Sequence, residues 1–84
     1  MYEVLLAVQA ERDLKRLEAG LFHRIVSQIH TLASDPRPAG CPKLAGSKRD
    51  YRIRVSEYRI LYEIDDKARK VRVMRVRHRR EAYR

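Results

Sequence analysis

The chain has 84 residues, of which 20 are Lys or Arg and 11 are Asp or Glu, so its net charge is +9 and its pI is about 10.3. This length predicts one small domain over residues 1–84, which excludes a large internal substrate cavity and favours chemistry on an open face. The chain has no apolar stretch of membrane-spanning length and no leader pattern, so we expect a cytoplasmic protein without a membrane partner. A single cysteine, Cys41, excludes an internal disulfide and a structural zinc site.

The positive charge is concentrated in the second half of the chain. Residues 1–47 carry six basic and five acidic side chains, whereas residues 48–84 carry fourteen basic and six acidic ones. Eleven of those fourteen cations are arginines, whose guanidinium group binds phosphate through two parallel hydrogen bonds. The pattern favours a nucleic-acid partner over an acidic protein, a membrane surface or a basic face kept only for solubility.

The first half of the chain is predicted to form one strand and two helices. The apolar run Tyr2–Ala7 is typical of a strand that is buried on both faces. Apolar residues then recur at intervals of three and four, which predicts a helix over Ala10–Ala19 and a second helix over Leu21–Ser34. Gly20 is expected to end the first of these helices.

The second half is predicted to form three strands. The prolines of Asp35–Pro38 cannot continue a helix, and the turn-forming residues 39–47 predict an ordered loop. Apolar and polar residues then alternate, which predicts strands over Tyr51–Val55, Tyr58–Ile64 and Val71–Arg77, with a less regular pattern around Met74.

A two-residue turn at Ser56 and Glu57 would fix the register of the first two of these strands. Arg54 would then lie directly across from Arg59, and Arg52 would share their face. Like charges in this arrangement favour a bound anion such as phosphate, although the arginines could also simply spread into water. For the next pair of strands we expect Ile64 opposite Val71, Glu63 opposite Arg72, and Arg59 near Val76.

The C-terminal segment adds groups that can transfer protons. Cleavage of a phosphodiester needs positive charge at the phosphate oxygens, a base for the 2′-hydroxyl and an acid for the leaving oxygen. His78 and Tyr83 are candidates for the proton transfers. The alternatives are that Tyr83 only packs the tail and that His78 is a solvated strand end. His23 and His30, in the helical half, are expected to be structural or surface residues.

Several short motifs follow one another in a fixed order along essentially the whole chain. They are Ala10 with Asp13-Leu14 and Leu17, Leu32-x-x-Asp35-Pro36, Lys43-Leu44-x-Gly46, Tyr51-Arg52-Ile53-Arg54-Val55, Tyr58-Arg59-Ile60-Leu61-Tyr62-Glu63-Ile64-Asp65, and Val76-x-His78-Arg79-Arg80-Glu81-x-Tyr83. Each motif is weak alone, but their order and spacing together resemble the RelE/ParE toxin superfamily of type II toxin–antitoxin systems.

The resemblance implies an α+β fold of order β-α-α-β-β-β, with an αα-hairpin on one face of a mainly antiparallel sheet. RelE-type members are ribosome-dependent endoribonucleases that cut mRNA in the ribosomal A site, and ParE-type members poison DNA gyrase. The partners that it implies are a cognate antitoxin, with which the chain could form a hetero-oligomer, together with the ribosome and mRNA. No cofactor and no metal ion is expected.

The site residues of RelE relatives can be carried over by position. They fall on Arg52, Arg54, Arg59, Arg79 and Tyr83. RelE itself has lysines on its second strand, whereas the arginines here titrate too high to act readily as acid or base. Proton transfer is therefore assigned to Tyr83, whose pKa nearby guanidiniums would lower, and to His78. Further RNA contacts are expected from Lys43, Lys48, Arg49, Arg77, Arg80 and Arg84.

Three functions remain open from the sequence. The first is an mRNA interferase, the second a gyrase inhibitor without cleavage chemistry, and the third an inactive remnant that binds RNA or only its antitoxin. The arginines, together with His78 and Tyr83, favour the first.

Overall fold

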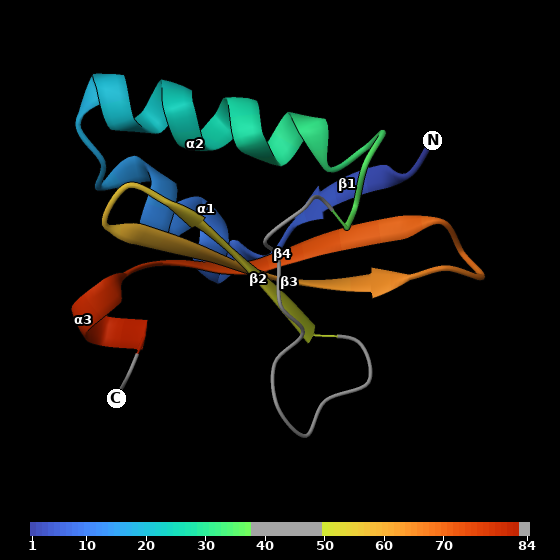
Figure 1. The fold of residues 1–84 in the computed structure, drawn as a ribbon. Coiled ribbons are helices and arrows are strands. Elements are labelled where there is room, and N and C mark those ends of the chain that lie inside the picture. The colour runs from blue at the N-terminus through green and yellow to red at the C-terminus, as the bar shows by residue number, and fades with distance from the viewer. Residues whose placement is uncertain (38–49, 83–84) are drawn as a thin grey trace.

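The computed structural model describes residues 1–37 and 50–82, which form a four-stranded sheet with two helices packed on it (Figure 1). The elements are β1 (Glu3–Leu6), α1 (Val8–Lys15), α2 (Ala19–Thr31), β2 (Asp50–Val55), β3 (Tyr58–Asp65), β4 (Lys70–His78) and the short α3 (Arg79–Ala82). The predicted α+β order β-α-α-β-β-β is confirmed, and α3 is an addition that the sequence did not indicate.

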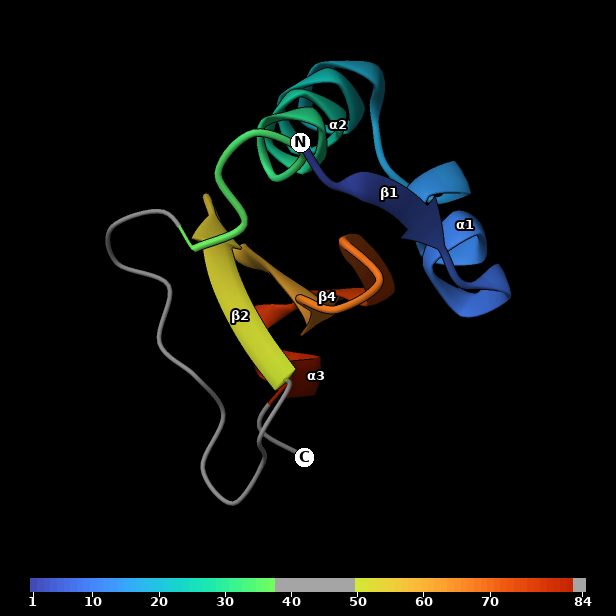
Figure 2. The same cartoon turned by 90° about the vertical axis from the view of Figure 1, so that its right-hand side faces the viewer.

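The sheet is mixed, with strand order β1-β4-β3-β2. The two C-terminal pairs are antiparallel, whereas β1 runs parallel to β4 at one edge. Figure 2 shows α1 beside β1 at this edge, with β2 at the far edge and α2 across the top. The C-terminal half of β4 continues beyond β1 and packs against α1.

The core lies between the helices and one face of the sheet. Alternating residues of the strands supply one side of it, and the apolar stripe of each helix supplies the other. Its buried members are Ala10, Leu14, Ile25, Ile29, Leu32, Ile53, Ile60, Tyr62, Ile64, Val71, Val73 and Val76.

The predicted boundary between the two helices was wrong. Gly20 does not end α1, which stops at Lys15, but lies in the first turn of α2. Glu18 begins α2 because its carboxylate accepts hydrogen bonds from the backbone N–H groups of Gly20, at 3.2 Å, and Leu21, at 2.6 Å. At its other end α2 stops at Thr31 rather than at Ser34, and the following residues form tighter, 3₁₀-like hydrogen bonds.

The expectation that the first strand is buried on both faces was also wrong. Because β1 pairs only with β4, it is an edge strand, and Leu5 and Leu6 remain 38% and 39% exposed. The first strand therefore leaves apolar surface in contact with water on both faces of the sheet edge.

The segment that follows α2 is anchored to the sheet before residue 38. The hydroxyl of the buried Tyr62 donates a hydrogen bond of 2.9 Å to the carbonyl oxygen of Pro36. Arg37 forms a two-point ion pair with Asp66, which also accepts a hydrogen bond from the Tyr2 hydroxyl. The Arg37 hydrogen bond, helped by that from Tyr2, lowers the pKa of Asp66. The predicted loop over residues 39–47, with Cys41, falls outside the described residues.

Candidate nucleic-acid interface

Three arginines form a row across three neighbouring strands. Arg54 of β2 lies opposite Arg59 of β3, as predicted, and Arg59 lies opposite Arg77 of β4. Directly paired residues share one face of a sheet, with Cβ atoms about 5 Å apart. The residues next to them, such as Ile60 and Val76, are buried under the helices, so this arginine row lies on the opposite, open face.

The row depends on an irregularity in β4. The predicted pairs Ile64–Val71 and Glu63–Arg72 are confirmed at one end of the β3–β4 ladder. Between Leu61 and Tyr62 the register then shifts by one residue, because Met74 is an extra residue in β4, a β-bulge.

The predicted approach of Arg59 to Val76 was therefore wrong. Beyond the bulge Val76 turns into the core, and Arg77 takes the place opposite Arg59. The bulge thus brings the third arginine onto the open face.

A buried carboxylate holds β4 just after this bulge. Asp13 of α1 is 9% exposed and accepts hydrogen bonds from Arg75 Nε, at 2.9 Å, and from Arg75 Nη2, at 3.2 Å. It also accepts one from the backbone N–H of Val76, at 2.9 Å. Burial alone would raise the pKa of Asp13, but the hydrogen bonds from Arg75 and Val76 outweigh it, and the pKa lies below its usual value.

The role of Asp13 was missed from the sequence, although a signal existed. Residues 10, 13, 14 and 17 lie on one face of a helix, so Asp13 stands among the apolar residues Ala10, Leu14 and Leu17. A carboxylate on a buried face requires a charged or hydrogen-bonding partner. The sequence could therefore have indicated a partner, but not which one.

A fourth arginine, Arg52, lies beside the row on the same face, opposite Leu61. The Nε atoms of Arg59 and Arg77 are buried, so the inner parts of these side chains are held by packing. Arg54 is exposed, and its Nε donates a hydrogen bond of 3.3 Å to the carbonyl oxygen of Ser56 in the turn.

The short helix α3, which begins with Arg79, lies at the same end of the sheet as the β2–β3 turn (Figure 1). The backbone N–H of Arg79 donates to the carbonyl oxygen of Glu57 at 2.7 Å, and its Nη1 lies 3.4 Å from the Glu57 carboxylate. Both side chains of this pair are more than half exposed. An incoming phosphate would therefore compete with Glu57 for a guanidinium that is already in place.

His78 lies on the other side of the sheet from the arginine row. It pairs with Tyr58, and the two rings meet edge to face with centroids 5.3 Å apart. Together with Asp13, Arg16 and other residues they line a small cavity of about 60 Å³ next to α1. The Nδ1 atom of His78 accepts a hydrogen bond of 3.2 Å from the backbone N–H of Arg80. The structure thus brings Arg52, Arg54, Arg59 and Arg77 onto one face and separates His78 from them.

The other predicted site residues fall into two groups. Arg80 is exposed in α3. The remaining ones lie outside the described residues, namely Lys43, Lys48, Arg49, Tyr83 and Arg84.

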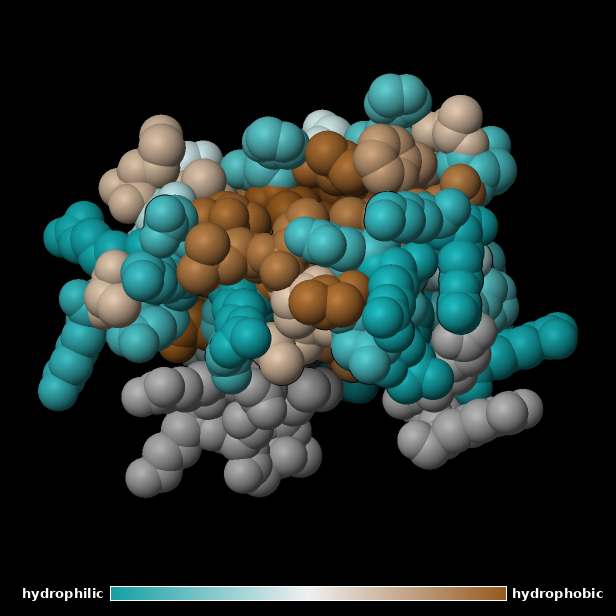
Figure 3. Space-filling model, turned by 180° about the vertical axis from the view of Figure 1, so that it is seen from behind, coloured by the Kyte–Doolittle hydropathy of each residue, from teal (hydrophilic) through white to brown (hydrophobic). Residues whose placement is uncertain are grey.

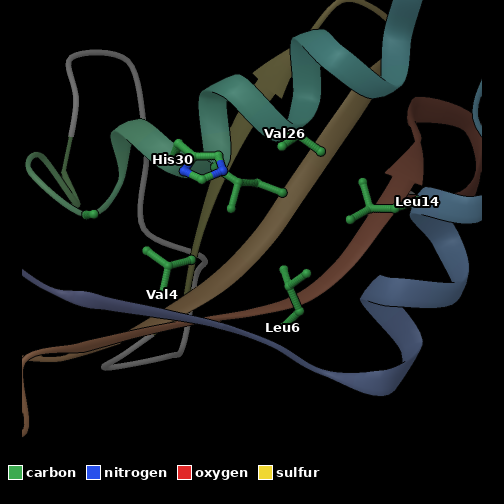
Figure 4. A pocket seen from close by; sticks show the side chains of 7 residues that line it. Val4, Leu6, Leu14, Val26 and His30 are labelled. Atoms are coloured by element: carbon green, nitrogen blue, oxygen red, sulfur yellow. The ribbon is translucent and has the colours of Figure 1, made fainter. Parts of the chain in front are cut away.

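A second surface feature lies on the helix side of the molecule. Seen from behind, hydrophobic side chains gather across the middle of the molecule beneath α2 (Figure 3). Val4 and Leu6 of β1, Leu14 of α1, and Val26 and His30 of α2 point toward one another there (Figure 4). They line an apolar groove of about 330 Å³.

Comparison with known proteins identifies the family to which this fold belongs. The family model for the ParE toxin of the type II toxin–antitoxin system parDE matches residues 4–83. The chain belongs to the RelE/ParE family of toxins. Toxin RelG of Mycobacterium tuberculosis is 34% identical over 99% of this chain and 97% of its own length.

Solved structures share the fold over nearly the whole chain. The toxin–antitoxin complex RelBE2 of Mycobacterium tuberculosis contains a chain that is 29% identical, with a TM-score of 0.80 over 92% of this chain and 96% of that one. The isolated E. coli RelE toxin is 22% identical, with a TM-score of 0.82 over 99% and 96% of the two chains. In the archaeal RelE–RelB complex of Pyrococcus horikoshii a chain is 24% identical, with a TM-score of 0.83 over 93% and 94%.

None of the described helices is long and apolar enough to cross a membrane. In residues 1–37 and 50–82, no three His, Cys, Asp or Glu side chains are grouped so that they could hold a metal ion.

Proposed function

We propose that this toxin is a ribosome-dependent endoribonuclease that cleaves mRNA and so inhibits translation in the cytoplasm. The observation that carries the proposal is the arginine row, Arg54–Arg59–Arg77, on an open sheet face with Arg52 beside it. Such a surface attracts the phosphate backbone of RNA and can surround one phosphodiester with guanidinium groups. The relatedness to toxins named RelG and RelE supports the same reaction.

The proposed reaction is an internal displacement at phosphorus that needs no cofactor. The 2′-hydroxyl oxygen of one nucleotide attacks the adjacent phosphorus, and its proton passes to a base. The bond from phosphorus to the 5′-oxygen breaks, that oxygen takes a proton from an acid, and a 2′,3′-cyclic phosphate remains. Arg59 and Arg77 stabilise the charge that grows on the phosphate oxygens, with Arg52, Arg54 and Arg79 around them.

Tyr83 is our candidate for the proton transfers. Arginine keeps its proton at physiological pH, so the row itself supplies charge and orientation rather than acid–base catalysis. His78 lies on the other face of the sheet, where its Nδ1 already accepts a hydrogen bond from Arg80. The tyrosine position is carried over from RelE relatives, and a phenolate beside guanidiniums has a lowered pKa.

A cognate antitoxin is the proposed protein partner. Related toxins have been crystallised in complexes with the antitoxin RelB. Here the apolar groove between β1 and α2 offers anchoring sites for apolar side chains of an extended or helical antitoxin segment, which could also cover the basic face.

Inhibition of DNA gyrase is the second candidate, because the family model that matches describes ParE toxins. A gyrase inhibitor needs no groups for cleaving RNA, so the arginine row would serve only in binding. The two activities differ in their products, which are mRNA fragments in one case and gyrase-dependent DNA breaks in the other.

One induction experiment separates these functions. The wild type and the variants Arg59→Gln, Arg77→Gln, Arg79→Ala and Tyr83→Phe are induced, and mRNA ends, protein synthesis and DNA breaks are compared. Loss of one charge-stabilising arginine should reduce cleavage about 10²–10³-fold, and Tyr83→Phe should reduce it about 10²–10⁴-fold. Lys67→Gln, which changes an exposed cation in the β3–β4 turn, is the control. DNA breaks without new mRNA ends would refute the proposed nuclease activity. If the wild type produces neither mRNA ends nor DNA breaks, the result would favour an inactive remnant.

A further inference from the structure

A second basic surface lies at the β2 edge of the sheet, next to the arginine row. It is an open groove of about 530 Å³ between α2 and the β2–β3 turn. Figure 1 shows this turn beneath the N-terminal half of α2. The groove is lined by His23, Arg24, Ser27, Gln28, Arg54, Val55 and Ser56.

The charge of this groove is one-sided. Arg24 is exposed, and within the described part of the chain it forms no ion pair. The sequence of α2 contains no acidic residue between Ala19 and Thr31. In the turn opposite, the carboxylate of Glu57 is paired with Arg79 of α3 and does not line the groove. Arg24 and Arg54 thus both line the groove, and no carboxylate is among the described residues that line it.

We propose that this groove binds the phosphate backbone of RNA at a second point, so that one RNA chain extends from the arginine row, past Arg54, to Arg24. The inference rests on the proposed function. Arg54 belongs to both surfaces, because it lies in the row and also lines the groove. Ser27, Gln28 and His23 add hydrogen-bond donors around the second phosphate site.

The polar lining favours RNA over a protein segment. Among the described residues that line the groove Val55 alone is apolar, whereas the groove between β1 and α2 is lined mainly by apolar residues. A protein segment gains most of its affinity from apolar anchors, while a phosphate backbone gains it from cations and released counterions. The two faces of α2 are therefore assigned to two kinds of partner.

The test compares Arg24→Gln with Arg12→Gln in the purified toxin. Both arginines are exposed on helices, and each change removes one positive charge. Arginine and glutamine have similar helix propensities, so neither change should disturb its helix. Arg12 lies on α1, which packs against β4 and β1 and not near the groove. Binding to a fluorescent single-stranded RNA is measured as a function of salt concentration, with Arg59→Gln as the reference for the arginine row.

We expect Arg24→Gln to weaken RNA binding about fivefold at low salt. It should also reduce the log–log salt slope by about 0.7, the value for one phosphate contact on a single strand. Arg12→Gln should keep the wild-type slope. If Arg24→Gln behaves like Arg12→Gln while Arg59→Gln loses affinity, the second contact is refuted and the proposed RNA face stands.

Two other results would also overturn the inference. If Arg24→Gln weakens only the binding of the antitoxin, the groove is a protein site. If the wild type binds RNA without salt dependence and Arg59→Gln has no effect, then the RNA face and this extension of it both fail.

Discussion

Replacing Asp13 by Ala should destabilise the protein more than any change at an exposed carboxylate. The substitution leaves the N–H of Val76 buried without its acceptor, which costs about 1–3 kcal/mol. Arg75 also loses its two hydrogen bonds to Asp13, but its side chain is 32% exposed, so water replaces part of that interaction and we add only about 1 kcal/mol. The expected loss in the free energy of unfolding is therefore about 2–4 kcal/mol.

Over most of the expected stability range the Asp13→Ala variant should still fold, so this loss can be measured. A chain of 84 residues has a stability of about 4–12 kcal/mol, and each kcal/mol shifts the Tm of such a domain by about 4–8 °C. Urea unfolding followed by circular dichroism should give a lower midpoint for Asp13→Ala with an unchanged m-value. Asp13→Asn should fall between it and the wild type, because one amide oxygen can still accept from Val76.

Glu11→Ala is the control, since this carboxylate is exposed on the same helix. Arg75→Gln keeps the hydrogen bond from Val76 but removes the cation paired with the buried Asp13 carboxylate, so it should also cost more than Glu11→Ala. If Asp13→Ala is as stable as Glu11→Ala, within about 0.5 kcal/mol, the carboxylate does not hold the bulge in the way that its geometry indicates.

Three further measurements test other parts of the structure. Because the pKa of Asp13 is lowered in the folded state, its stabilisation is fully present above the ordinary pKa of about 3.9 and is lost as the pH falls through the lower folded value. The stability difference between wild type and Asp13→Asn should therefore shrink in acid, and a difference that stays constant would contradict this account. Glu57→Gln frees Arg79 from its exposed ion pair and should tighten RNA binding up to about fivefold, whereas the exposed Glu11→Gln should have a smaller effect. Leu6→Ala should weaken antitoxin binding about fivefold, since full burial of a leucine side chain contributes about 1.5–3 kcal/mol and Leu6 is only 39% exposed before the antitoxin binds. Leu5→Ala is its matched control, being equally exposed but outside the groove, and equal losses in the two variants would place the antitoxin elsewhere.

The antiparallel register of β2 and β3 could be predicted because two independent features agreed. The alternation of Ile53 and Val55 with arginines defined the buried face, and the turn at Ser56 and Glu57 fixed the pairing. Ser56 has φ of 55°, a left-handed conformation that usually favours glycine or asparagine, so residue preference alone argued against this turn. The strong alternation on both sides outweighed the unfavourable turn residue.

The helix boundary could not be predicted in the same way. Glycine commonly ends helices, which favoured an end at Gly20. The sequence has no serine, threonine, aspartate or asparagine at residues 16–19 to indicate the start of the next helix. Glu18 takes that role through its carboxylate, although glutamate is not among the residues usually found there. Local residue preferences therefore predicted an end of the first helix at Ala19, whereas α1 ends at Lys15.

The composition of the site depends on one inserted residue. With an unbroken β3–β4 ladder, Val76 would lie opposite Arg59, and by alternation His78 would share the open face with the arginines. The bulge at Met74 reverses every later side chain of β4, so that Arg77 joins the row and His78 turns toward α1. The sequence indicates this only weakly, through the three-residue spacing of the buried Val73 and Val76. The backbone N–H of Val76, just after the bulge, is bonded to Asp13, which belongs to a different element. Because of the bulge, the open face carries the permanently charged guanidinium of Arg77 instead of the imidazole of His78, and the alternation within β4 alone could not show this.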